Sequence, residues 1–281
     1  IVGTNPDDSG RARYGATLPV LGLMFAASER LHLYATAGRG FETPTLNELA
    51  YRPNGATGLN FDLRPARSDN LELGAKLRLP DWGDLNAALF RTGTRDEIVT
   101  ASNSGGRSTY QNAGATRRQG LELGWTRTVA EHLRAQAALT LLDATYRDAF
   151  QSCNVTPCTP ATSQTIPAGN RLPGIARSSF ATTLGWAPPL GWRGGIEARW
   201  LSRVVVNDAN ADAAPGFGVV NANLGYVARV GAWRVNGYAR IDNVFARRYA
   251  GSVIVNEGNG RYFEPAPGST WLAGVSAGLA F

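Results

Sequence analysis

The stretch Leu71-Glu-Leu-Gly-Ala-Lys-Leu-Arg-Leu79 decides the fold of this chain. Its apolar residues occupy every second position, and Glu72, Gly74, Lys76 and Arg78 stand between them. Successive side chains of a β-strand point to opposite faces, so this alternation predicts a strand with one apolar and one polar face. Residues 133–141, 233–242 and 271–281 repeat the pattern. The chain is therefore expected to be all-β.

Extended over all 281 residues, the same periodicity predicts eleven strands. Each is long enough for a tilted strand to cross a bilayer, which takes about 9–11 residues. No run of 18 uncharged apolar residues occurs, which excludes a membrane-spanning helix. The expected strands lie near residues 15–27, 31–41, 69–79, 84–100, 115–128, 132–146, 174–187, 192–205, 215–229, 232–245 and 269–281.

The connections between these strands alternate between two lengths. Short turns are expected at 28–30, 80–83, 130–131, 188–191 and 230–231, and long polar loops at about 42–68, 101–114, 147–173, 206–214 and 246–268. This sorting is typical of outer-membrane barrels, which have short periplasmic turns and long extracellular loops. A soluble sandwich also alternates its faces but has no reason to sort its loops by length.

The tryptophans support a membrane location. Trp82, Trp186, Trp192 and Trp233 stand beside short turns, whereas Trp200 and Trp271 stand near the long loops. Two belts at opposite strand ends match the aromatic girdles of membrane barrels. The alternative is the core of a soluble sheet, in which tryptophans are expected nearer the strand centres.

Composition alone resembles that of a soluble protein, with 43% hydrophobic residues and a mean hydropathy of −0.19. A membrane barrel keeps its average hydropathy low, however, because only one side chain in two faces lipid. The net charge of +6 comes almost entirely from arginines scattered along the chain. They form no basic cluster or helical stripe, so nucleic-acid binding is not expected.

The predicted number of strands, eleven, is odd. Bacterial single-chain barrels have even strand numbers, and an open sheet leaves unpaired edge groups in lipid. We therefore expect residues 1–281 to be the C-terminal part of a barrel of about 22 strands, with residue 1 a cut inside an extracellular loop of a longer protein. Barrels of that size enclose a plugged lumen and serve as transporters.

The two cysteines lie close together in Ser152-Cys-Asn-Val-Thr-Pro-Cys158. A disulfide between Cys153 and Cys158 suits a polar loop in an oxidising compartment. The other interpretation is half of a metal site, but no nearby histidine or second cysteine pair completes one.

Four segments together resemble the C-terminal half of TonB-dependent receptors. Tyr34 to Leu49 is similar to the family's "Y…GF-x-x-P-x-L-x-E-L", and Arg64 to Lys76 to its "L-x-P-E-x-S-x-N-x-E-L-G" strand entry. Tyr110 to Leu123 resembles "Y-x-N-x-G-x-x-x-x-x-G-x-E", and Asp242 to Tyr249 resembles "x-N-L-F-D-x-x-Y". The terminal Phe281 resembles the outer-membrane assembly signal. The family's plug domain, TonB box and first strands are absent from these residues.

The resemblance implies TonB-dependent uptake of a scarce ligand, most often a ferric siderophore, in the Gram-negative outer membrane. It implies four partners: the TonB complex through the missing N-terminal part, the siderophore, outer-membrane lipid and the barrel assembly machinery. The alternatives are a porin-like diffusion channel, which would lack an upstream plug, and an outer-membrane adhesin. Haem, cobalamin and other chelates stay open as ligands.

Ligand contacts are expected on the long loops, because a rigid scaffold carries function on its loops. Anionic chelates favour Arg and Tyr, so the candidates are Tyr51, Arg52, Arg107, Tyr110, Arg261, Tyr262 and Phe263. Each could equally be an ordinary solvated side chain. The sequence offers no catalytic constellation, no metal-ligand spacing and no cofactor motif. The lumen-facing charges are expected to pair with each other or with a plug.

Overall fold

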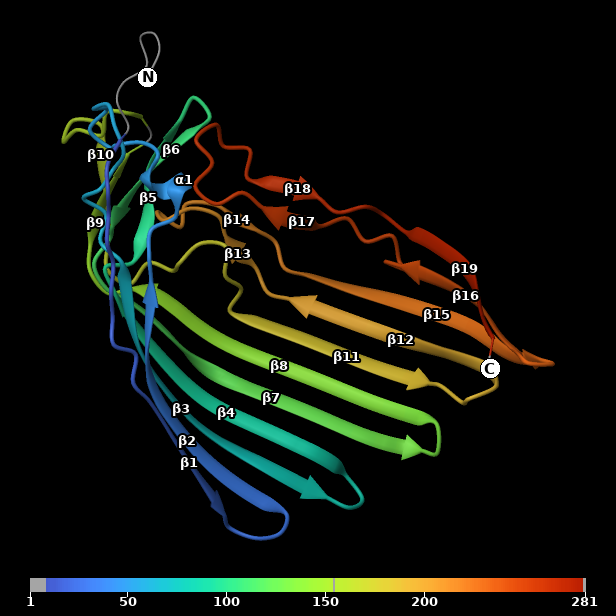
Figure 1. The fold of residues 1–281 in the computed structure, drawn as a ribbon. Helices are drawn as coiled ribbons and strands as arrows, with labels where there is room; N and C mark the ends of the chain where they lie inside the picture. The colour runs from blue at the N-terminus through green and yellow to red at the C-terminus, as the bar shows by residue number, and fades with distance from the viewer. Residues whose placement is uncertain (1–8, 154, 280–281) are drawn as a thin grey trace.

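A computed structural model describes residues 9–153 and 155–279. Eleven long strands form one antiparallel sheet in which strands consecutive along the sheet are also consecutive along the chain (Figure 1). The eleven predicted strands are thereby confirmed. They are β1 (Val20–Ala26), β2 (Leu31–Glu42), β3 (Ala66–Leu79), β4 (Gly83–Arg95), β7 (Thr116–Ala130), β8 (Leu133–Tyr146), β11 (Ser178–Trp186), β12 (Gly191–Leu201), β15 (Phe217–Val230), β16 (Trp233–Asp242) and β19 (Thr270–Leu279).

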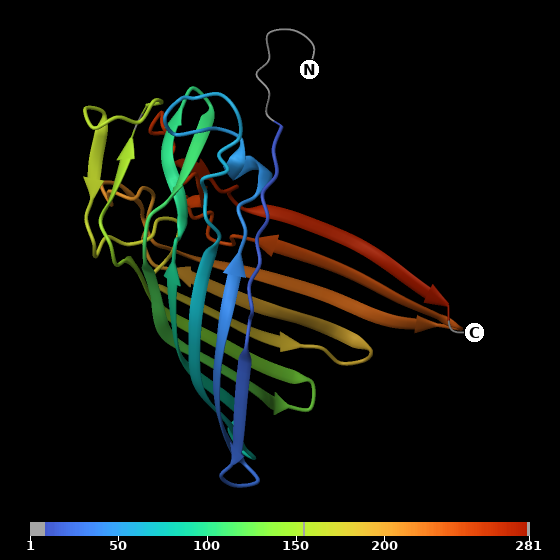
Figure 2. The same ribbon diagram turned by 60° about the vertical axis from the view of Figure 1, so that its left-hand side comes forward.

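The sheet curls into a trough with β1 and β19 at its two open edges (Figures 1 and 2). The short turns gather at one end of the trough, and the long connections gather at the other. β1 begins at the loop end and β19 ends at the turn end. No helix in the described part of the chain is long and apolar enough to cross a membrane.

The convex and concave faces of the trough follow the alternation in the sequence. Leu73, Leu89, Leu121 and Leu141 are paired across β3, β4, β7 and β8 and form one continuous row. Leu73, Leu89 and Leu141 are 52%, 59% and 42% exposed. Such a belt of exposed leucines belongs against lipid and marks the outer face.

The opposite face carries the charges predicted to line the lumen, and several of them pair with one another. Arg240 donates to both carboxylate oxygens of Glu197, at 3.2 and 2.8 Å, and to Asp242 at 2.8 Å. Tyr34 donates to Glu72 at 2.6 Å. The expectation that these charges pair is met for this group.

The connections at the loop end contain structure that strand periodicity did not predict. They hold the short helix α1 (Leu46–Leu49) and eight short strands. β5 (Ile98–Ser104), β6 (Arg107–Asn112), β9 (Phe150–Cys153) and β10 (Ser163–Ile166) form one small sheet. β13 (Val204–Val205) pairs with β14 (Ala213–Ala214), and β17 (Ala250–Val253) pairs with β18 (Phe263–Pro265).

Several expected strands are longer than the observed ones, including those expected at 15–27, 174–187 and 192–205, and for two others a backbone turn gives the reason. The strand expected at 84–100 breaks at Asp96, whose φ of 56° turns the backbone out of the sheet. Glu97 then turns its carboxylate to Arg118 and Thr116, with contacts of 2.7 Å. The strand expected at 232–245 ends at Asp242, because Asn243 adopts a φ of 52°. Positive φ is tolerated by Asn and Asp at turns and cannot continue a strand.

Candidate functional site

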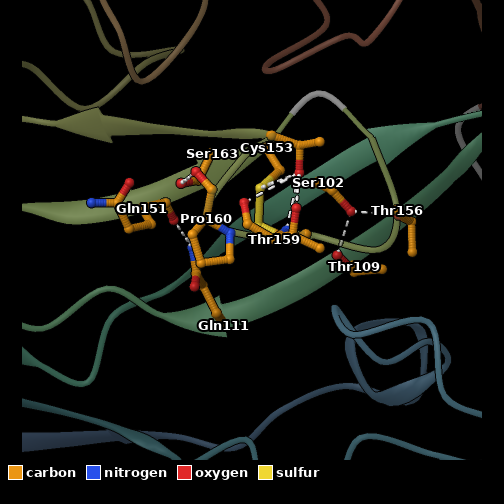
Figure 3. The surroundings of a disulfide bond; sticks show 11 residues. Ser102, Thr109, Gln111, Gln151, Cys153, Thr156, Thr159, Pro160 and Ser163 are labelled. Carbon is orange, nitrogen blue, oxygen red and sulfur yellow. Dashed lines mark hydrogen bonds between the residues drawn. A yellow bond between two sulfur atoms is a disulfide. The ribbon is translucent and has the colours of Figure 1, made fainter.

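The small sheet of β5, β6, β9 and β10 is the frame of the loop end. The disulfide joins Cys153 at the end of β9 to Cys158, with 5.5 Å between their Cα atoms (Figure 3). Beside it, the Ser102 hydroxyl of β5 lies 2.7 Å from the hydroxyls of both Thr109 and Thr156 (Figure 3). These contacts tie the loop after β8 to the hairpin after β4.

A compact apolar core fastens this frame to the barrel wall. Tyr146, at the end of β8, is 2% exposed and packs with Ile166 and Leu172. Its ring meets that of Phe150 edge-on, with centroids 4.9 Å apart. The loops are therefore anchored on the rim of the sheet by burial of apolar surface, which is the main favourable contribution to folding.

Asp208 is the polar centre of the loop end. Its side chain accepts hydrogen bonds from the Tyr146 hydroxyl at 2.7 Å and the Asn256 amide at 2.9 Å. The residue is 2% exposed, and burial raises its pKa while the two hydrogen bonds oppose that rise. Because Asp208 and Asn256 belong to different connections and Tyr146 ends β8, this network fixes the two loops relative to each other and to the barrel rim.

Two further asparagines extend the network. Asn170, after β10, donates to the backbone carbonyl of Asp208 at 2.8 Å. Asn103, in β5, donates to the carbonyl of Asn256 at 3.1 Å. Four of the five long connections thus meet at one point.

A cavity of about 380 Å³ opens at this meeting point. Asp208 and Glu257 supply carboxylates to its wall, and among the described residues that line it there is no arginine or lysine. Tyr262 is one of the predicted ligand residues and lies on this wall, 3.5 Å from the Asn207 amide. The cavity can offer hydrogen bonds but no positive charge.

A second depression of about 260 Å³ brings together two more predicted residues, Arg52 and Tyr110. They come from the loop after β2 and from β6. Arg52 is held by a hydrogen bond from its Nε to the carbonyl of Leu59 at 3.1 Å. The predicted Tyr51 and Arg107 contact each other, with the guanidinium 5.2 Å from the ring centroid. These four candidates therefore form one neighbourhood that joins two connections.

The remaining predicted residues lie apart from that neighbourhood. Arg261 and Phe263 flank Tyr262 as exposed side chains, and Phe263 is 44% exposed. Phe281 lies outside the described residues. Sequence reasoning missed Asp208, Asn256 and Asn103. The only local signal was the polar run Asn207-Asp-Ala-Asn210, which looks like an ordinary loop.

Asparagines in the motifs quoted above have structural roles. Asn112 exchanges hydrogen bonds with the backbone of Arg64, at 2.9 and 2.8 Å, and donates to the carbonyl of Asp96. Asn243 is 4% exposed and exchanges bonds with the backbone of Arg247, both at 2.8 Å. These side chains replace backbone partners where the loops leave the strands.

Across the described ranges, no three His, Cys, Asp or Glu side chains gather in a way that could hold a metal ion. His132 lies at the turn end and meets the ring of Trp186 edge-on, with centroids 5.6 Å apart. His32 is the second residue of β2 and is paired with Ala26, the last residue of β1, beside the turn that joins these strands.

The arrangement of strands, turns and loops has a counterpart in a known family. The family model for the TonB dependent receptor-like β-barrel matches residues 2–244. The chain belongs to this family. TonB-dependent receptors are β-barrels of the Gram-negative outer membrane, which locates the eleven strands in that membrane.

Individual relatives are distant. The metal-pseudopaline receptor CntO of Pseudomonas aeruginosa is 25% identical over 248 residues, which cover 86% of this chain and 31% of that protein. The TonB-dependent receptors that resemble this chain include siderophore and metal receptors, and they are transport proteins rather than enzymes. This chain spans between about a quarter and a third of the length of the curated relatives it matches.

Solved structures show the same fold. The siderophore receptor PiuA of Acinetobacter baumannii superposes with a TM-score of 0.70 at 20% identity, over 92% of this chain and 35% of PiuA. The ferric-catecholate import receptor Fiu of E. coli K12 gives 0.66 at 22% identity, over 93% of this chain and 34% of Fiu. At these identities the likeness concerns the fold alone.

Proposed function

We propose that the chain is part of a receptor that imports a metal chelate, namely a ferric siderophore, across the outer membrane under TonB control. The receptor names of its relatives support this proposal, since they include siderophore and metal-chelate receptors. The carrying observation is the loop end itself, where Arg52 and Tyr110 from two connections line one outward depression.

The chemistry of that depression favours an anionic, oxygen-rich ligand. A guanidinium presents several donors in a fixed plane and stays charged at neutral pH, which suits catecholate or carboxylate oxygens. Asn60, Asn112 and Gln111 add neutral donors and acceptors to the same wall. The cavity around Tyr262, which among the described residues is lined by carboxylates and by no arginine or lysine, would instead contact the hydroxyl or amide periphery of a chelate.

The proposal includes the remainder of the barrel. β1 and β19 each have one neighbour in the sheet, so their outer edges present unpaired backbone groups. Unpaired groups cost several kcal/mol each in hydrocarbon, so a membrane sheet must close. We propose that further strands of a longer protein close it at about 22 strands, with a plug inside through which TonB acts.

Uptake of radioactive iron by iron-starved cells tests the function. Cells that carry the full-length receptor should accumulate a ferric catecholate or a ferric hydroxamate, and cells that also lack TonB should not. Uptake that persists without TonB would identify a diffusion channel. Failure with both chelates, together with binding to host macromolecules, would favour an adhesin.

Variants of the depression connect that result to named residues. Arg52→Ala should weaken binding of the imported ferric chelate by about tenfold or more, as expected for loss of a charged hydrogen bond. Arg147→Ala is the matched control, because Arg147 is a loop arginine outside the lining of the Arg52 depression. Equal effects of the two variants on chelate binding would show that this depression is not the binding site.

A further inference from the structure

The outer face of the sheet changes its chemistry within one row of side chains. Above the leucine row on the lipid side, the next paired row toward the loop end contains Arg91, Gln119 and Asp143. Two residues along a strand span about 7 Å. The boundary between hydrocarbon and polar headgroups therefore lies between these two rows on β4, β7 and β8.

Arginines dominate this polar zone. Arg117 and Arg171 approach Asp143 to 3.9 and 3.6 Å, and Arg91 and Arg177 line the same shallow depression as Asp143. We name these four arginines with Asp143 the outer arginine patch. The patch thus contains one carboxylate and four guanidinium groups, so its net charge is strongly positive.

The guanidinium donors in the patch are short of acceptors. The Arg171 Nη1 and Nη2 atoms and the Arg117 Nε atom are inaccessible to water and have no hydrogen-bond partner among the described residues. Burial, and next the nearby charge of Arg177, lowers the pKa of Arg171. Buried guanidinium donors without partners keep their charge poorly compensated, which favours a negative group beside the patch.

Arg91 and Arg177 differ from the buried pair. Both are exposed, and neither side chain makes a hydrogen bond or an ion pair with the described part of the chain. Directly below them, Leu89, Leu121 and Leu141 form the apolar floor of the depression. Cationic groups above an apolar floor fit a molecule with an anionic head and hydrocarbon tails.

A second group of the same kind lies on neighbouring strands. Asp69 of β3 bridges Arg39 of β2 at 3.2 Å and Arg95 of β4 at 3.1 Å. Arg67 lies beside them with its guanidinium 6.0 Å from the ring centroid of Phe41. The positive zone therefore continues along the rim of the outer face from β2 to β8.

We propose that the outer arginine patch binds the phosphate headgroup of a lipid in the outer leaflet. Phosphate oxygens are good acceptors for guanidinium groups, and basic pockets at the membrane surface bind anionic headgroups. The lipid tails lie along the leucine row, and the phosphate accepts hydrogen bonds from the exposed Arg91 and Arg177, while the less exposed Arg117 and Arg171 add positive charge behind them. The proposal requires only that the leucine face contacts lipid, and it does not depend on which chelate the receptor imports.

The test measures binding of bisphosphorylated lipid A to the full-length receptor in detergent by native mass spectrometry. The wild-type receptor should retain this lipid and discriminate against the same lipid after removal of its phosphates. Arg91→Gln and Arg177→Gln should each weaken retention by about fivefold, and the lysine replacements should lose less. Arg127→Gln is the matched control, since Arg127 lies on the same face at the turn end beside Trp82.

Each outcome of this experiment either supports or overturns the binding of a lipid phosphate by the patch. Equal retention of the phosphorylated and dephosphorylated lipid would overturn the proposal, as would equal losses in the patch and control variants. Displacement of the lipid by millimolar inorganic phosphate alone would assign the patch to a free anion and would also overturn it. Heat-modifiable gel mobility confirms that each variant is folded, and chelate uptake measured in parallel distinguishes this result from failure of the proposed function.

Discussion

Within the described residues, the Tyr146 hydroxyl joins the barrel rim to the buried carboxylate of Asp208. Tyr146→Phe should leave one oxygen of that carboxylate without its partner, at a cost of about 1–3 kcal/mol in the stability of the loop cluster. Hydrogen exchange of the amides around residues 207–210 in the full-length receptor measures this cost as faster exchange.

Tyr249→Phe is the matched control for that substitution. The Tyr249 ring stacks on Phe217 with centroids 4.1 Å apart, and no hydrogen bond of its hydroxyl is found within the described ranges. Exchange should therefore be unchanged in this variant. If both variants accelerate exchange equally, the bond to Asp208 is not what holds the loops.

Asp208 should also make the loop cluster sensitive to pH. Burial raises its pKa above the ordinary value of 3.8, so the protonated form is favoured in the folded cluster. The resulting stabilisation is complete below that ordinary value and is lost as the pH rises through the raised pKa. Protease protection of the loops should decline over that interval in the wild type and stay flat in Asp208→Asn. Asp212→Asn, at an exposed position, should keep the wild-type decline.

Among the elements, the β9–β10 hairpin depends on its disulfide. The bond closes a short loop between Cys153 and Cys158, and cross-links of this size stabilise by about 2 kcal/mol in the chain-entropy model. The Cys153→Ser, Cys158→Ser double variant should expose residues 153–166 to protease while the barrel strands stay protected. Cleavage inside the strands as well would show that the disulfide supports more than this hairpin.

The two faces of β4 should respond oppositely to the same new charge. Leu89→Arg places a guanidinium on the lipid face, one row below the headgroup boundary, and should cost about 1–2 kcal/mol, less than the about 2–4 kcal/mol of the membrane midplane. Ala88→Arg points to the lumen, where its cross-strand partner is Glu122, and should be tolerated. The folded fraction of the full-length receptor, measured by heat-modifiable gel mobility, compares the two. Similar losses would contradict the assignment of faces.

For the whole molecule, the decisive question is whether β1 and β19 meet. They lie at opposite edges of the sheet, so cysteines placed at Leu23 and Val275 in the full-length receptor should not cross-link. Cysteines at Leu23 and Ala35, which are paired across β1 and β2, should cross-link readily. A bond between β1 and β19 would mean that eleven strands close by themselves, and it would remove the proposal of a larger barrel.

The strand count, the two faces and the sorting of short turns from long loops all follow from the sequence. Each depends on a local period of two residues, or on runs of turn-forming residues, that neighbouring positions reveal by themselves. Leu71 to Leu79 shows its lipid and lumen faces without any reference to the rest of the chain. The family resemblance depended on the same stretches, and the family model confirms it.

Tertiary structure alone decided what happens at the loop end and at the rim of the outer face. Tyr146, Asp208 and Asn256 are separated by 62 and 48 residues, and irregular loops carry no period from which such meetings could be predicted. The same holds for Arg52 and Tyr110, which were predicted separately and share one depression. Arg177 shares a depression with Arg91, and Arg171 approaches Asp143, although both arginines belong to the segment between β10 and β11. The two-residue periodicity of the sequence therefore determined the strands of the barrel wall. The contacts between distant loops determined which side chains lie together where a ligand could bind.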